Sequence, residues 1–200
     1  MEHKPSLRAL LADIAACRIC AGELAHGPRP VFQLSGTARL CIAGQAPGMR
    51  VHKTGIPYND PSGERLRDWL GIGRDVFYDR TRVAIVPMGF CFPGYDAAGG
   101  DRPPRPECVR HWHDRLFAAT PKFKLLLAIG TYAQRYHFKG GAKKTVTETV
   151  RSWREYGPFA MPLPHPSWRN NGWLKKNPWF ETELIPDLRA RVAELLSSGR

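Results

Sequence analysis

Four short apolar runs, each followed by residues with helical spacing, restrict this chain to a small set of folds. The runs cover residues 39–43, 82–86, 124–129 and 159–163. Strands that alternate with helices along a chain form a parallel sheet, and helices cover both of its faces. We therefore predict an α/β fold with a short, mostly parallel sheet of four strands.

The helices are expected before, between and after these runs. Residues 5–16 place Leu7, Leu10, Leu11 and Ile14 on one face of a first helix. Proline suits the first turn of a helix, so another helix is expected to begin at Pro106. The remaining helices are expected over 66–70 after the turn NDPSG, over 131–138, and after Asn177, where Pro186 divides the helix or begins a new one.

Length, composition and charge set the class of protein. The chain has 200 residues, 42% hydrophobic and 24% charged, which is globular usage and suits a single domain over residues 1–200. The apolar runs are too short to span a membrane, and the N-terminus lacks the pattern of a secretory signal, so we expect a soluble, cytoplasmic protein. The net charge of +12 points to a polyanionic partner, most simply nucleic acid, although a basic enzyme of another kind fits the composition too.

The five cysteines fall into two pairs and one isolated residue. In a cytosolic chain they are not expected to form disulfides. Cys17 and Cys20 form C-x2-C, and Cys91 and Cys108 flank a Pro/Gly-rich stretch. These four thiols suit zinc or an iron-sulfur cluster equally well. Cys41 lies inside an apolar run and is expected to be a buried core residue.

Polar residues follow the ends of the predicted strands. Parallel sheets bind ligands in the crevice beyond the carboxyl ends of their strands. These ends carry GQAPG (44–48), PMGFC (87–91), GTY (130–132) and HPS (165–167). Four polar side chains are therefore expected to face one pocket: Gln45, Asp60, His165 and Ser167.

Each of these segments has a structural and a functional interpretation. GQAPG suits a plain strand-to-helix turn, or a turn whose backbone amides approach a ligand closely. Asp60 precedes a proline, which is typical of turns, but its carboxylate could also lie at the pocket mouth. Tyr58 could stack on a base or pack in the core. Trp168 beside Arg169 suits insertion between bases, or a solvated loop with the indole folded onto the core.

The order and spacing of GQAPG, KTGIPY, the four cysteines and HPS resemble the uracil-DNA glycosylase superfamily. The chain is most similar to its iron-sulfur branches, known as families four and five, and the resemblance runs nearly end to end. It implies a three-layer αβα fold. It also implies a structural [4Fe–4S] cluster, with zinc as the alternative metal, held by Cys17, Cys20, Cys91 and Cys108.

The resemblance further implies a monofunctional hydrolase of base-excision repair that cleaves the N-glycosidic bond of a flipped-out base in DNA. His165 would donate to a uracil carbonyl oxygen, and Tyr58 would stack on the base. The residues implied to bind the base or the DNA are Gly44, Gln45, Ala46, Pro47, Gly48, Tyr58, Asn59, Ser167, Trp168, Arg169 and Asn170.

This chain departs from the family pattern at two places. Gln45 and Ala46 stand where the classical and family-four enzymes carry an acid. Asp60 falls near the acid of family five, with a one-residue gap, and is our candidate catalytic acid beside His165 and Gln45. Pro87 replaces the asparagine that reads the base, so Asn59 or main-chain groups are expected to substitute. Uracil is the expected base, with other deaminated or oxidised bases as alternatives.

Two other functions remain open at this stage. Because the usual motif acids are absent, the chain could be a damaged-base-binding protein of the same fold that does not turn over, or that traps its substrate covalently. A basic zinc-binding module for RNA is the weaker alternative. For the glycosylase we expect damaged DNA as the partner, and a monomer.

Overall fold

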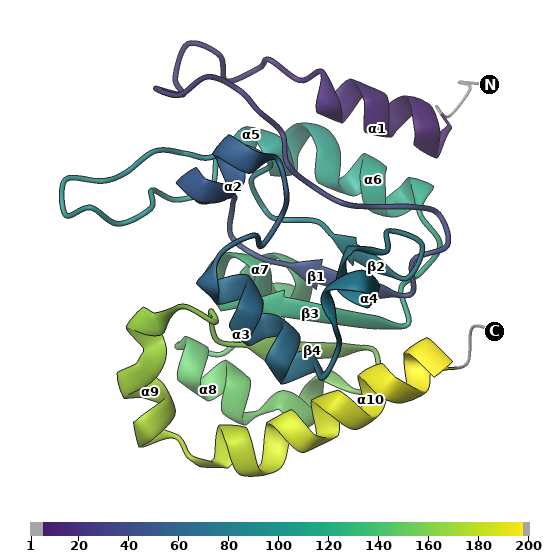
Figure 1. Ribbon diagram of the computed structural model, residues 1–200, viewed down its shortest axis with the longest axis vertical. Helices are drawn as coiled ribbons and strands as arrows, with labels where there is room; N and C mark the ends of the chain where they lie inside the picture. The colour runs from purple at the N-terminus through teal and green to yellow at the C-terminus, as the bar shows by residue number, and fades with distance from the viewer. Residues whose placement is uncertain (1–5, 198–200) are drawn as a thin grey trace.

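The computed structural model describes residues 6–197 and places four parallel strands in one sheet (Figure 1). The order across the sheet is β2–β1–β3–β4, and each neighbouring pair runs parallel. Leu40 pairs with Val83 on one side and with Leu125 on the other. The predicted α/β fold with a four-stranded parallel sheet is therefore confirmed. The strands are β1 (Leu40–Ala43), β2 (Val83–Ile85), β3 (Leu125–Ile129) and β4 (Ala160–Leu163).

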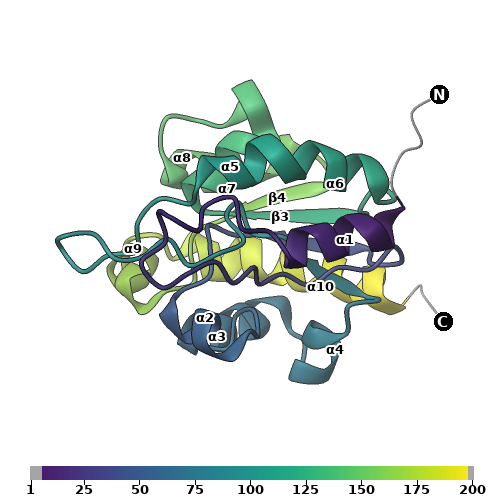
Figure 2. The same ribbon diagram turned by 90° about the horizontal axis from the view of Figure 1, so that it is seen from above.

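Helices lie on both faces of this sheet, which gives the three layers that the resemblance implies (Figure 2). No helix within the described part of the chain is both long enough and apolar enough to cross a membrane. The α-helices are α1 (Leu7–Ala15), α2 (Met49–Thr54), α3 (Pro61–Leu70), α4 (Arg74–Tyr78), α5 (Pro106–Cys108), α6 (Asp114–Ala119), α7 (Gly130–Phe138), α8 (Val146–Arg151), α9 (Asn171–Lys176) and α10 (Ile185–Ser197). Two π-helical segments cover Val109–His113 and Phe180–Leu184.

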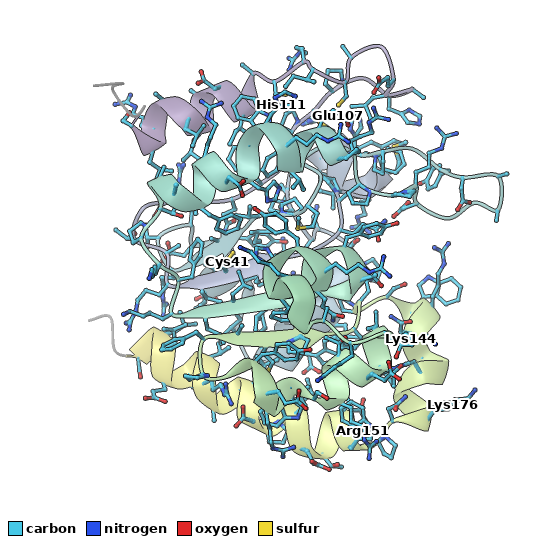
Figure 3. The ribbon with its side chains drawn as sticks, turned by 180° about the vertical axis from the view of Figure 1, so that it is seen from behind. Cys41, Glu107, His111, Lys144, Arg151 and Lys176 are labelled. Atoms are coloured by element: carbon cyan, nitrogen blue, oxygen red, sulfur yellow. The ribbon has the colours of Figure 1, made fainter. Side chains whose placement is uncertain are left out.

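The alternation of side chains along β1 divides the core between the two faces. Leu40 and Ile42 pack with residues of α3, α4 and α10 on one face. Cys41 points to the other face, where it packs with residues of α1 and α6. Successive side chains of a strand point to opposite faces, so one strand serves both cores. Cys41 is fully buried, as predicted, and Figure 3 shows it inside the sheet.

Two helix boundaries differ from the expected ones, and one of the two outcomes expected at Pro186 is observed. The first helix begins at Leu7 rather than at residue 5, which lies outside the described residues. The segment NDPSG is not a separate turn, because α3 already begins at Pro61 with Asp60 as its N-cap. At the C-terminal end, Pro186 is the second residue of α10, a helix that directly follows a π-helical segment. Proline is tolerated in a first helical turn, so it marks a fresh start there.

Candidate functional site

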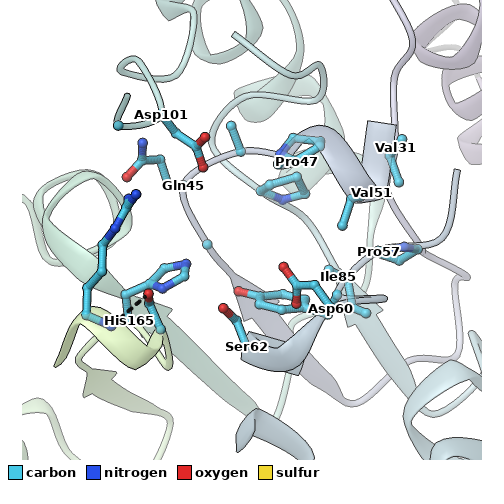
Figure 4. A pocket seen from close by; sticks show the side chains of 18 of the residues that line it. Val31, Gln45, Pro47, Val51, Pro57, Asp60, Ser62, Ile85, Asp101 and His165 are labelled. Atoms are coloured by element: carbon cyan, nitrogen blue, oxygen red, sulfur yellow. Dashed lines mark hydrogen bonds between the residues drawn. The ribbon is translucent and has the colours of Figure 1, made fainter. Parts of the chain in front are cut away.

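A pocket of about 390 Å³ lies beyond the carboxyl ends of the strands (Figure 4). Its walls come from the turn after β1, the segment before α3, the end of β2 and the loop after β4. The four polar residues expected to converge, Gln45, Asp60, His165 and Ser167, all line it. The other expected residues that line it are Gly44, Ala46, Pro47, Gly48, Tyr58, Arg169 and Asn170, together with Pro87.

The turn at residues 44–48 is fixed by backbone hydrogen bonds to the segment that follows β2. The amide of Met88 donates to the carbonyl of Gly44, and the amide of Gly89 donates to the carbonyl of Gln45, each at 2.9 Å. A Cβ atom on Gly44 would lie 2.5 Å from the hydroxyl oxygen of Tyr58. Such a contact is too short for real atoms, so the close approach of Tyr58 requires glycine here.

Tyr58 packs into the pocket floor. Its ring lies edge-on to Phe77 with centroids 6.1 Å apart, and its hydroxyl group reaches Gly44. Burial, and secondly the nearby charge of Asp60, raise the pKa of the Tyr58 phenol, so it stays neutral. A Cβ atom on Gly63 would overlap the carbonyl oxygen of Tyr58, so the start of α3 also depends on glycine.

Asp60 caps α3 and lines the pocket with the same side chain. Its Oδ1 accepts a hydrogen bond of 2.8 Å from the amide of Gly63, two residues inside the helix. An N-cap aspartate satisfies an amide that has no partner within the helix. The structural interpretation of Asp60 is therefore correct. Because one oxygen is held by the helix, the carboxylate has a fixed orientation at the pocket wall.

His165 is a partly buried imidazole on the opposite wall. Burial lowers its pKa, while the charge of Asp60 raises it to a smaller extent, so the ring is neutral at neutral pH. The loop that carries it is held by side chains: Asn170 donates from Nδ2 to the carbonyl of His165 at 2.7 Å, and Arg65 donates from Nη1 to the carbonyl of Ser167 at 3.0 Å. A neutral imidazole can donate one hydrogen bond to a ligand.

Two of the expected residues do not line the pocket. Asn59 is partly buried and is not among the residues that line the pocket. Its side-chain amide therefore does not take the place of the asparagine amide that Pro87 replaces. Trp168 is 68% exposed, and the Arg169 guanidinium lies 5.8 Å from its ring centroid. The indole is not folded onto the core. It lies instead on the surface of the loop that forms one pocket wall.

The four paired cysteines line a second, smaller cavity of about 20 Å³. Cys17 and Cys20 follow α1, Cys91 follows β2, and Cys108 ends α5. Burial is the largest influence on three of these thiols: it raises the pKa of Cys20, that of Cys91 to about 12 and that of Cys108 to about 11. The amide of Phe90 donates to the Cys108 sulfur at 3.4 Å. Four sulfurs from distant segments thus surround one space, which fits a metal centre.

One cysteine of this cavity also belongs to a mixed group of possible metal ligands. Among the described residues, the group of three ligand atoms within 4.8 Å of one another belongs to Cys20, Glu23 and Glu107, and no three cysteines meet that limit. Both of these carboxylates already form ion pairs with Arg105. Four thiols that line one cavity suit either zinc or an iron-sulfur cluster.

The sequence profile of the uracil DNA glycosylase superfamily matches residues 32–189. The chain belongs to this superfamily. Among solved structures, it is similar to a candidate uracil DNA glycosylase from Methanosarcina acetivorans, with 17% identity, coverage of 81% of this chain and 98% of that one, and a TM-score of 0.47. SMUG2 from Pedobacter heparinus has 12% identity, coverage of 81% and 74%, and a TM-score of 0.37.

Two polar residues of this glycosylase-superfamily pocket, Ser62 and Asp101, were missed by sequence reasoning. Asp101 lines the pocket from a hairpin between β2 and α5, in which Tyr95 and Asp101 form an antiparallel bridge. The only sequence signal is a single acid between glycines and the run RPPRP, which belongs to no motif. Apolar residues that complete the wall were missed as well, namely Val31, Val51, Pro57 and Ile85.

Proposed function

We propose that this protein is a monofunctional DNA glycosylase that hydrolyses the N-glycosidic bond of uracil, or of a related deaminated or damaged base, in DNA. The proposal rests on one observation. The chain belongs to this superfamily, and a single pocket is lined by the 44–48 turn, the Asp60 carboxylate and a neutral His165. A base can enter such a pocket only after it has flipped out of the helix.

The chemistry requires opposite charges at two points. Breaking the bond leaves negative charge on the departing base and positive charge on the sugar, as in other glycosyl transfers. A hydrogen bond from neutral His165 stabilises the base anion, and the Asp60 carboxylate stabilises the sugar cation. The cap to Gly63 holds Asp60 in place before the reaction begins, so little reorganisation is needed.

Base selection depends on the main chain and on Tyr58. Pro87 lines the pocket but offers no amide to a base edge. Backbone groups of the 44–48 turn and the Tyr58 ring therefore bind the base. Because these groups recognise a planar ring with carbonyl oxygens, uracil is the expected base, and other deaminated bases are the alternatives.

A [4Fe–4S] cluster is proposed at Cys17, Cys20, Cys91 and Cys108, which line one cavity, with zinc as the alternative metal. When bound, the cluster supplies structure rather than redox chemistry. The four cysteines connect the loop after α1 to the segments on both sides of the 94–102 hairpin. The hairpin between these segments carries Gly100 and Asp101 of the pocket wall, so the cluster would stabilise this side of the site.

DNA binding is supported by the net charge of +12 and by the surface around the pocket. Trp168 lies beside the pocket and Arg169 lines it. Lys144 and Lys176 lie at the end of the molecule that carries α9 (Figure 3). We propose that Trp168 fills the gap that the flipped base leaves, that the basic residues contact phosphates, and that the protein acts as a monomer.

The test compares wild type with Asp60→Asn on uracil-containing single- and double-stranded oligonucleotides, with alkali to reveal abasic sites. Asparagine still caps helices, so the variant should fold and bind DNA. Excision should fall by about 10²–10³-fold, as when one preorganised electrostatic group is lost. Unchanged excision by the variant would refute the catalytic role of Asp60. Absence of excision by wild type would refute the proposed glycosylase activity.

The alternative of a damaged-base-binding protein without turnover has one observation in its favour. Gln45 and Ala46 occupy the turn where relatives carry an acid, so the turn itself provides no carboxylate. That alternative predicts tight binding of uracil-containing DNA by wild type with no abasic product. A covalently trapped complex would instead survive denaturation in a gel.

A further inference from the structure

A second carboxylate faces Asp60 across the pocket. Asp101 lines the pocket from the 94–102 hairpin, and Figure 4 shows it on the wall opposite Asp60. Its carboxylate lies against the 44–48 turn: a Cβ atom on Gly48 would be 3.8 Å from Oδ2. Figures 1 and 2 both show the hairpin projecting at the end of the molecule that carries α9. Asp101 thus lies where the hairpin base meets the pocket mouth.

The carboxylate of Asp101 is available for chemistry, whereas that of Asp60 is partly engaged. Within residues 6–197, no hydrogen bond or ion pair holds the Asp101 side chain, while Asp60 Oδ1 caps α3. Asp101 is exposed overall, but partial loss of water at the pocket wall is the largest influence on its carboxyl group and raises the pKa of that group. Asp60 and Asp96 raise it further, and Arg169 lowers it. A carboxylate with a raised pKa is a better proton acceptor.

Gln45 fixes the position of this carboxylate. Its Nε2 donates to the carbonyl oxygen of Arg102 at 3.1 Å, one residue after Asp101. The amide of Arg102 in turn donates to the carbonyl of Gly94 at 2.9 Å and closes the hairpin. Gln45, which stands where relatives carry an acid, therefore connects the hairpin to the 44–48 turn of the pocket.

We propose that Asp101 is a second catalytic carboxylate, which binds the attacking water and accepts its proton, and that Gln45 is its positioning residue. This inference rests on the proposed glycosylase function. The water oxygen bonds to C1′ of the sugar while the bond from C1′ to the base nitrogen breaks. The electron pair of that bond leaves with the base, and one water proton passes to Asp101. The base anion, held by His165, takes a proton from solvent after release.

The experiment measures single-turnover excision of uracil and, separately, affinity for uncleavable DNA. Asp101→Asn should excise about 10²–10⁴-fold more slowly, the range for a lost general base, and should bind DNA within about threefold of wild type. Asp96→Asn is the matched control, because it removes one charge from the same hairpin while its Oδ1 still caps Ala98 and Gly100. It should excise within about threefold of wild type.

Two further variants separate catalysis from structure. Asp101→Ala should regain at least about tenfold of its lost rate with added formate, a free carboxylate that can take the proton. Gln45→Ala should lose about tenfold by itself and nothing further when combined with Asp101→Asn, since both act through one carboxylate. Excision by Asp101→Asn equal to that of Asp96→Asn would overturn this inference alone. Absence of excision by wild type would overturn both the inference and the proposed function.

Discussion

Replacing Gly44 with alanine tests the close packing between the turn after β1 and Tyr58. The new Cβ would lie 2.5 Å from the Tyr58 hydroxyl oxygen, and ordinary contacts begin at 3.4 Å. The hydroxyl must therefore move by about 0.9 Å. Tyr58 cannot move freely, because its ring packs against Phe77. We expect Gly44→Ala to lower the free energy of unfolding by about 1–3 kcal/mol, as for other overpacked sites.

The same displacement should reduce excision. A shift of about 1 Å in a group that positions the substrate can cost about 10²-fold in rate. Removing the hydroxyl should relieve the clash, because the next atom of Tyr58 is Cζ at 3.5 Å from the new Cβ. The double variant Gly44→Ala/Tyr58→Phe is therefore expected to recover most of the stability and excision that Gly44→Ala loses.

The assay combines urea unfolding with single-turnover excision for wild type, both single variants and the double variant. Tyr58→Phe alone should stay within about 1 kcal/mol of wild type, which is a typical change for one lost hydroxyl group. The double-mutant cycle should show a coupling energy of at least about 1 kcal/mol between the two positions. Additive effects would refute the packing argument.

Three other predictions address the DNA surface, the core and the metal centre. Trp168→Ala should weaken binding to uracil-containing DNA by about 1–3 kcal/mol, as for other stacking residues. Phe159→Ala, which removes an aromatic ring that is 66% exposed just before β4, should leave affinity unchanged. Equal losses of affinity would contradict a specific role for Trp168. Burial lowers the pKa of His113 to about 4 from an ordinary 6.5, so the unfolded chain takes up a proton as the pH falls below 6.5 and the native protein does not. The free energy of unfolding therefore falls on acidification. In urea titrations, His113→Phe should reduce its fall between pH 6.5 and pH 4.5 by about 2 kcal/mol. The same pH dependence in the variant and in wild type would show that His113 is not the cause. Cys108→Ala should remove bound iron and the absorbance near about 400 nm expected of an iron-sulfur cluster. Cys41→Ala is the control and should keep both. Zinc instead of iron in the wild-type protein would contradict the proposed cluster.

The sequence predicted the sheet and most of the pocket for one physical reason. Parallel strands end at one edge of a sheet, so the residues that follow Ala43 and Leu163 must lie near one another. That argument brought Gln45 and His165 together without any knowledge of side-chain contacts. The sequence left open whether Trp168 is exposed or folded onto the core, and the structure shows an exposed indole.

The remaining features depend on tertiary packing that no local pattern records. Asp101 reaches the pocket because Gln45 ties a hairpin to the turn, a contact between residues 57 positions apart. The contact of Tyr58 with Gly44 likewise follows from the path of the chain between β1 and α3. Asp60 shows that one side chain can fill both roles that the sequence offered as alternatives, since it caps α3 and lines the pocket.

The measurement that tests the central claim most directly is the identification of both products from a uracil-containing duplex treated with the cluster-loaded protein. Mass spectrometry would detect the free base, and alkali would cleave the strand at the abasic site. The proposed function predicts equal amounts of released uracil and alkali-labile sites, with no strand cleavage before alkali. Bound but intact DNA, with neither product, would contradict it.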